Sequence, residues 1–155
     1  MTKTNPDALR ELIQAFIHRF GLLDLTRTPC GLSISVSDAH ALMELLKTPN
    51  IDQMNLSKRL GLSKSATTRL VQRLKRRGQI SRCRNQLDGR AYNLNLTDKG
   101  KRQAEMINRE SLKIFGAIIS GLSEDAAQQL MQSIPLLIKA IPEFNRNSKS
   151  EFIQV

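Results

Sequence analysis

The sequence predicts an α+β fold that is mainly α-helical and carries one small β-hairpin. Three observations lead to this fold class. Apolar residues recur every three or four positions through most of the chain, which is the spacing of one helix face. At residues 93–96, polar Asn and apolar Leu alternate instead, as they do in a half-buried strand. The 155 residues are enough for one domain with one core.

Two helices are predicted before residue 50. The first opens at Asn5-Pro6-Asp7 and ends before the breaker at 28–31. The second has Ser37 as its candidate N-cap and stops at 48–50. Each helix carries an apolar stripe: Leu9, Leu12, Ile13, Phe16, Ile17 and Phe20 in the first, and Ala39, Leu42, Met43 and Leu46 in the second.

The middle of the chain predicts two further helices and the hairpin. A short helix over 55–60 is followed by a tight turn at Gly61 and a longer helix over 64–77, capped by Ser63 and closed by Gly78. The strands cover 80–84 and 91–96, with the hairpin tip at 85–89.

Two long helices complete the prediction. Thr97 caps a helix that continues to about 122, and Ser123 starts a last helix in which Pro135 can produce a kink. The chain therefore divides into N-terminal helices for dimerisation and linkage (5–47), a DNA-binding region (48–100), C-terminal dimerisation helices (101–142) and a mobile polar tail (143–155). The apolar stripes of the first and last helices exceed what one such chain can bury, so we expect a homodimer.

Positive charge is concentrated in one block of the sequence. Residues 55–102 hold 14 of the 24 Lys and Arg but only 2 of the 14 Asp and Glu. A single cation here could be ordinary solvated surface, but a whole basic block favours a polyanionic partner. Membrane binding would place the cations on one amphipathic helix. One Tyr, five Phe and no Trp make stacking on unpaired bases a poor alternative, so double-stranded DNA is the expected partner.

The segment 55–70 has the form of a helix–turn–helix. At the start of its second helix, Ser65, Thr67 and Thr68 are small enough to approach base edges, and Arg69 can reach a guanine. Lys64 and the helix N-terminus can hold phosphates, and Arg73 is assigned to the same interface. An ordinary capped surface helix would show a similar pattern, so the segment alone does not decide the function.

The hairpin that follows turns this unit into a winged helix–turn–helix. At its tip, Arg90 can enter a minor groove, and Asp88 could pair with Arg90 or only stabilise the turn. Arg84, on the first strand, is a third candidate DNA contact of the wing.

The sequence resembles the MarR family of winged-helix transcription regulators over about residues 9–141. The resemblance is carried by LGLSKSATTRLVQRL from Leu60 to Leu74, by Asp-x-Arg at Asp88 and Arg90, and by Leu-Thr-x-x-Gly from Leu96 to Gly100. It implies a homodimer held by the first and last helices, with two recognition helices in successive major grooves of a pseudo-palindrome. This chain departs from the pattern at Gly89, where a second Arg is frequent, and at Gln79, where an apolar residue is frequent.

The resemblance also implies an effector cleft between the dimer helices and the winged domain. By position, its candidate residues are Phe16, His18, Phe20, His40 and Met43, although core packing is the preferred explanation for Phe16, Phe20 and Met43. Cys30, in the link between the first two helices, is a candidate oxidant sensor, with an inert thiol as the alternative.

No catalytic motif is present, so we do not expect an enzyme. Two Cys and two separated His do not form a metal site, and no cofactor is expected. The sequence has no signal peptide or membrane span, which predicts a cytoplasmic protein. We therefore predict a sequence-specific regulator that binds double-stranded DNA as a homodimer, a repressor released by a small-molecule or oxidative signal. The alternative is an architectural protein that binds DNA without sequence preference.

Overall fold

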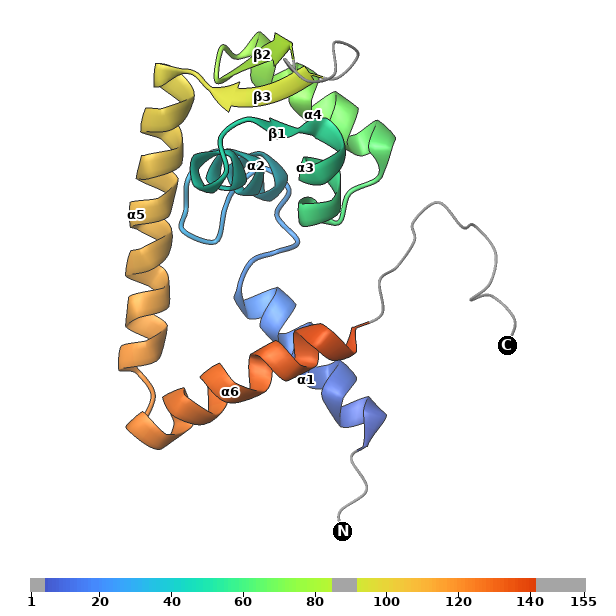
Figure 1. Cartoon of the computed structure of the whole chain (residues 1–155). Coiled ribbons are helices and arrows are strands. Elements are labelled where there is room, and N and C mark those ends of the chain that lie inside the picture. The colour runs from blue at the N-terminus through green and yellow to red at the C-terminus, as the bar shows by residue number, and fades with distance from the viewer. Residues whose placement is uncertain (1–4, 85–91, 142–155) are drawn as a thin grey trace, which may run out of the picture.

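The computed structural model describes residues 5–84 and 92–141, and within them the chain forms six helices and a three-stranded sheet. The predicted tail (143–155) and the wing-tip residues lie outside the described part. The elements are α1 (Pro6–Arg19), α2 (Val36–Lys47), β1 (Ile51–Asp52), α3 (Gln53–Leu60), α4 (Lys64–Arg76), β2 (Ile80–Arg84), β3 (Tyr92–Leu96), α5 (Asp98–Ser120) and α6 (Glu124–Ala140). Figure 1 shows α2, α3, α4 and the sheet as one lobe, with α5 leading away from it to α6.

Each helix begins at a side chain that accepts a hydrogen bond from the backbone of its first turn, as an N-cap should. The predicted caps at Ser63 and Thr97 are confirmed, and Ser123, which was predicted to start the last helix, is the N-cap of α6. The predicted cap of the second helix is wrong, because Ser35 and not Ser37 accepts from the Asp38 amide. The third helix begins two residues earlier than expected, because Asp52 caps it.

The sheet has the order β1-β3-β2 with antiparallel pairing throughout. The hairpin strands pair Ile80 with Leu96 and Arg84 with Tyr92. The two-residue strand β1 was not predicted. Its start is fixed by Asn50, whose backbone N–H donates to Asn95 Oδ1 at 2.9 Å and whose side-chain oxygen accepts from Asn95 Nδ2 at 2.7 Å.

The hydrophobic core lies inside the lobe and against the first half of α5. Its largest fully buried side chains come from α2, α3, α4, β3 and α5: Leu42, Leu45, Leu56, Leu70, Val71, Leu74, Leu94 and Ile107. Helices α1 and α6 contribute no buried residue. Leu12 of α1 and Leu136 of α6 are 69% and 68% exposed, so both helices present large apolar side chains that one chain leaves uncovered.

Hydrogen bonds and close packing join the start of α5 to the end of α4 and the start of the wing. Thr97 Oγ1 donates to the Gly78 carbonyl oxygen at 2.7 Å, and the Thr97 N–H donates to the Gln79 carbonyl oxygen at 3.1 Å. That same Gln79 oxygen faces Gly100 so closely that a Cβ on residue 100 would lie 1.8 Å from it. Gly100 is therefore required here for its lack of a side chain.

Candidate nucleic-acid interface

Helix α4 divides into a buried face and a cationic face. Thr67, Leu70, Val71 and Leu74 are buried against the lobe. The opposite stripe is exposed at the helical spacing and consists of Ser65, Arg69, Gln72 and Arg76, flanked by Lys64 and Lys75. Residues 64–84 contain no Asp or Glu that could neutralise this face.

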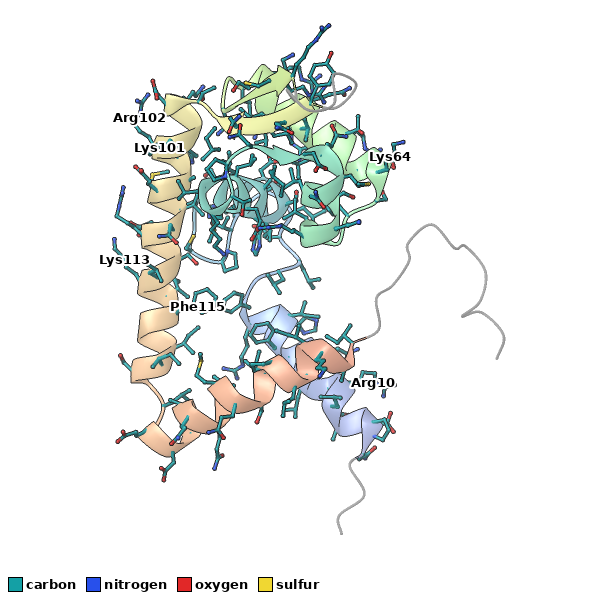
Figure 2. The ribbon with its side chains drawn as sticks, in the orientation of Figure 1. Arg10, Lys64, Lys101, Arg102, Lys113 and Phe115 are labelled. Atoms are coloured by element: carbon teal, nitrogen blue, oxygen red, sulfur yellow. The ribbon has the colours of Figure 1, made fainter. Side chains whose placement is uncertain are left out.

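The position of Lys64 is clear in Figure 2, where it lies at the edge of the lobe, on the side away from α5. Gln72 was missed by the sequence analysis. Gln72 follows Arg69 by three residues and Ser65 by seven, and residues at this spacing lie on the same face of a helix. The spacing alone could therefore have indicated it.

The two threonines near the start of α4 lie in different environments, and one of them departs from the expectation. Thr67 is fully buried, and its hydroxyl donates to the Ser63 carbonyl oxygen at 3.0 Å, so the expectation that it approaches base edges is wrong. Thr68 is partly exposed. Its hydroxyl donates to the Lys64 carbonyl oxygen at 2.9 Å and accepts from Gln53 Nε2 at 2.8 Å. Only Thr68 therefore remains on the accessible side.

Arg73 is also placed differently, because it points toward α2 instead of outward. Its Nε donates to both carboxylate oxygens of Asp38 at 3.1 and 3.0 Å, and Nη2 bonds to the same carboxylate. These hydrogen bonds raise the pKa of the Arg73 guanidinium. Arg77 Nη1 adds a further bond to Asp38 at 3.0 Å. The assignment of Arg73 to DNA is therefore corrected, because its side chain anchors α4 to Asp38 of α2.

Asp38 is the functional residue that sequence reasoning missed most completely. It is only 1% exposed, yet it lies 35 and 39 positions from the two arginines that neutralise it. Buried carboxylates are rare unless paired, but no local pattern reveals a partner so distant in the sequence.

The described part of the wing supplies further cations. Arg84 is exposed on β2, as are its neighbours Arg82 and Cys83. Arg82 Nη2 donates to Gln53 Oε1 at 3.1 Å, so the wing strand is connected to α3. The predicted contacts of Asp88 and Arg90 lie outside the described residues.

A separate cavity of about 290 Å³ lies between α1, α2, α5 and the link before α2. Four of the five predicted effector residues line it: Phe16, Phe20, His40 and Met43. His18 is exposed and is not part of this lining, because it lies on another face of α1, so its assignment is corrected.

Aromatic rings form one wall of this cavity. The ring centroid of Phe20 is 5.0 Å from that of Phe16 and 5.7 Å from that of Phe115. Figure 2 shows Phe115 on α5, at the level of the start of the link after α1. Cys30 also lines the cavity, with its Sγ 3.1 Å from Thr28 Oγ1. Among the described lining residues there is no Lys, Arg, Asp or Glu.

Residues 5–84 and 92–141 contain no group of three or more His, Cys, Asp or Glu placed to hold a metal ion. None of their helices combines the length and the apolar character needed to cross a bilayer.

Comparison with known proteins gives consistent matches. The family model described as "MarR family" matches residues 31–91. The uncharacterized HTH-type transcriptional regulator YdgJ of Bacillus subtilis (strain 168) is 28% identical over 98 residues, which span 63% of this chain and 60% of YdgJ.

Two solved structures extend the likeness to most of the chain. The PcaV transcriptional regulator from Streptomyces coelicolor, solved with its natural ligand, superposes with a TM-score of 0.67 at 27% identity, over 88% of this chain and 94% of PcaV. The MepR–DNA complex of S. aureus gives a TM-score of 0.71 at 19% identity, over 90% of this chain and 100% of MepR, which shows the shared fold.

Proposed function

Because the chain belongs to the MarR family, whose members are transcription regulators and not enzymes, we propose that it regulates transcription by binding a specific site in double-stranded DNA. The observation that carries this proposal is the exposed stripe of α4, where Ser65, Arg69 and Gln72 can face base edges. Lys64 and Arg76 lie beside it and can contact phosphates. MepR, a protein of the same fold, was solved in complex with DNA, which supports DNA as the partner.

Selection of bound sequences from random duplex DNA tests the proposal. We expect one pseudo-palindrome, with half-sites about one helical turn apart. Arg69→Ala should then cost about 1–3 kcal/mol on the selected site and little on a scrambled duplex. Arg109→Ala, which removes an exposed arginine from α5, is the matched control. Uniform recovery of all sequences would instead identify an architectural DNA-binding protein.

The proposed active form is a homodimer. Exposed apolar side chains on α1, the end of α5 and α6 form a surface that one chain leaves uncovered: Leu9, Leu12, Phe16, Ile118, Ile119, Met131, Leu136 and Ile138. Apolar patches of this extent mark association surfaces. Light scattering should give a dimer mass, and Leu136→Glu should convert it to a monomer mass. Met54→Glu, at an exposed methionine of α3, should leave the dimer intact.

The cavity beside α1 is the proposed effector site, and its occupation would release a repressor from DNA. PcaV is a relative solved with its natural ligand, which supports a small-molecule effector. The cavity is near the lower end of the range for ligand pockets, about 300–1000 Å³. Its described lining holds no Lys or Arg, and His40 is the lining side chain that could carry a positive charge. We therefore infer an uncharged, largely apolar ligand, since burying an unpaired carboxylate is costly.

An oxidative signal would use the same cavity. Oxidation of Cys30 would add polar bulk to the lining, next to the Thr28 hydroxyl. Mild peroxide should then weaken DNA binding by the wild-type protein and leave Cys30→Ser unaffected. Equal effects on both proteins would exclude this route. A cytoplasmic location would suit either signal.

A further inference from the structure

We propose that Gln53 is a positioning residue for DNA recognition, because its side-chain amide connects Thr68 of the recognition helix to Arg82 of the wing strand. The inference rests on the proposed function. It goes further by making the two DNA-contacting elements one coupled unit. Nothing in the sequence pattern around Gln53 pointed to such a role.

Gln53 is well placed to act as a fixed support. It is the first residue of α3 and follows the strand β1, which is paired with β3 through Asp52 and Asn93. Asp52 caps α3 by accepting from the Asn55 N–H at 2.8 Å. The Gln53 backbone is therefore held by the sheet on one side and by the helix on the other, and its side chain is half-buried.

The two ends of the Gln53 amide have distinct partners. Oε1 accepts from Arg82 Nη2 at 3.1 Å, and Nε2 donates to Thr68 Oγ1 at 2.8 Å. In the opposite orientation of the amide, the Gln53 NH2 group would face the Arg82 guanidinium, and both groups are donors. The two partners therefore define the orientation of the amide. A neutral residue with one acceptor and one donor suits this position.

The contacts limit what each partner can offer to DNA. The Thr68 proton is committed to the Lys64 carbonyl oxygen, so toward a base this hydroxyl can act only as an acceptor. Among the residues that the structure describes, Arg82 donates to Gln53 through Nη2, and its other N–H groups are the ones that would contact a phosphate. Gln53 thus holds Arg82 in place before DNA arrives, which reduces the ordering cost of binding.

A double-mutant cycle tests the inference on the full-length protein with the selected duplex. Gln53→Met and Arg82→Met should each weaken binding about three- to tenfold, and the double variant should be little worse than Arg82→Met alone. Arg84 is the control, because it lies on the same strand without a bond to Gln53, so Gln53→Met and Arg84→Met should be additive.

Two measurements separate positioning from loss of fold. The melting temperature of Gln53→Met should stay close to wild type, and hydrogen exchange of the β2 amides should accelerate in this variant without DNA. An additive cycle with Arg82, wild-type affinity of Gln53→Met, or unchanged exchange would overturn the inference. The exchange arm needs no DNA, so its outcome is distinguishable from failure of the proposed function, which would appear as wild-type protein that selects no duplex.

Discussion

Replacement of Asp38 by Asn tests whether the buried ion pair holds the recognition helix in place. The substitution keeps the size of the side chain and one acceptor but removes its charge. Asp38 then no longer compensates the guanidinium groups of Arg73 and Arg77, which bond to it from α4. We expect the free energy of unfolding to fall, because both arginines approach a carboxylate that is only 1% exposed.

The magnitude follows from how far the arginines can rehydrate. Breaking a fully buried pair costs about 3–5 kcal/mol when the remaining charge stays buried. Here the Arg73 and Arg77 side chains are 35% and 51% exposed and can regain water. The cost should therefore be near 2 kcal/mol, within the range of about 1.5–3 kcal/mol for a hydrogen bond to a charged group. For a chain of this length this corresponds to a fall of about 4–8 °C in melting temperature.

Thermal unfolding followed by circular dichroism, at one fixed protein concentration, measures this loss. The matched control is Glu110→Gln, which removes the charge from an exposed pair with Lys113 at 2.7 Å and should change stability by less than about 0.5 kcal/mol. If Asp38→Asn is no more destabilising than Glu110→Gln, the buried pair does not anchor α4 and the reasoning fails.

Three further predictions concern other parts of the chain. Gly100→Ala should destabilise the fold by several kcal/mol, because the new Cβ would collide with the Gln79 carbonyl oxygen. In Gly116→Ala the new Cβ would meet no atom within 4 Å, so this variant should stabilise α5 by about 0.5–1 kcal/mol. Chemical denaturation of both variants measures the two changes in the free energy of unfolding. The hydrogen bond from the Asn55 backbone lowers the pKa of Asp52, so its stabilisation is complete above an unfolded-state pKa of about 3.9 and is lost as the pH falls through the lower folded-state value. Asp52→Ala should thus cost about 1 kcal/mol at neutral pH and much less in strong acid, and an unchanged difference would contradict the cap. In calorimetric titrations, 1-naphthalenemethanol should bind at least about tenfold more tightly than 1-naphthoate, and Ser111→Arg, which adds a cation to the cavity lining, should reverse that order. Tighter binding of the carboxylate by the wild type would refute an uncharged ligand.

The fold was predictable because its signals are local. Ser63, Thr97 and Ser123 each stand just before an apolar stripe, and the structure uses all three as caps. Ser35 and Ser37 are equally good caps by type, and only the geometry of the Asp38 amide distinguishes them. The strand β1 escaped prediction because two residues carry no alternation pattern, and its partner β3 is about 40 positions away.

The candidate interface was predictable in composition but not in orientation. The basic block identified α4, yet Thr67 and Arg73 were placed on the wrong face. The phase of α4 is fixed by packing: Thr67 lies on the same face as Leu70 and Leu74 and is buried with them. Arg73 could not be assigned from the sequence, since its partner Asp38 belongs to another helix. A pattern of neighbouring residues carries no information about contacts between segments that are distant in the sequence.

The length of α5 has a mechanical consequence. Its 23 residues make a rod of about 34 Å, with the wing junction at one end and the apolar side chains of Ile118 and Ile119 at the other. Because Thr97 and Gly100 lock the first turn to the lobe, the rod and the lobe must swing together. A tilt of about 5° at the far end displaces the lobe by about 3 Å, close to the 3.4 Å rise of one base pair. A small tilt at the apolar end of α5 would therefore be enough to shift α4 by about one base pair along the DNA groove in which we propose that it binds.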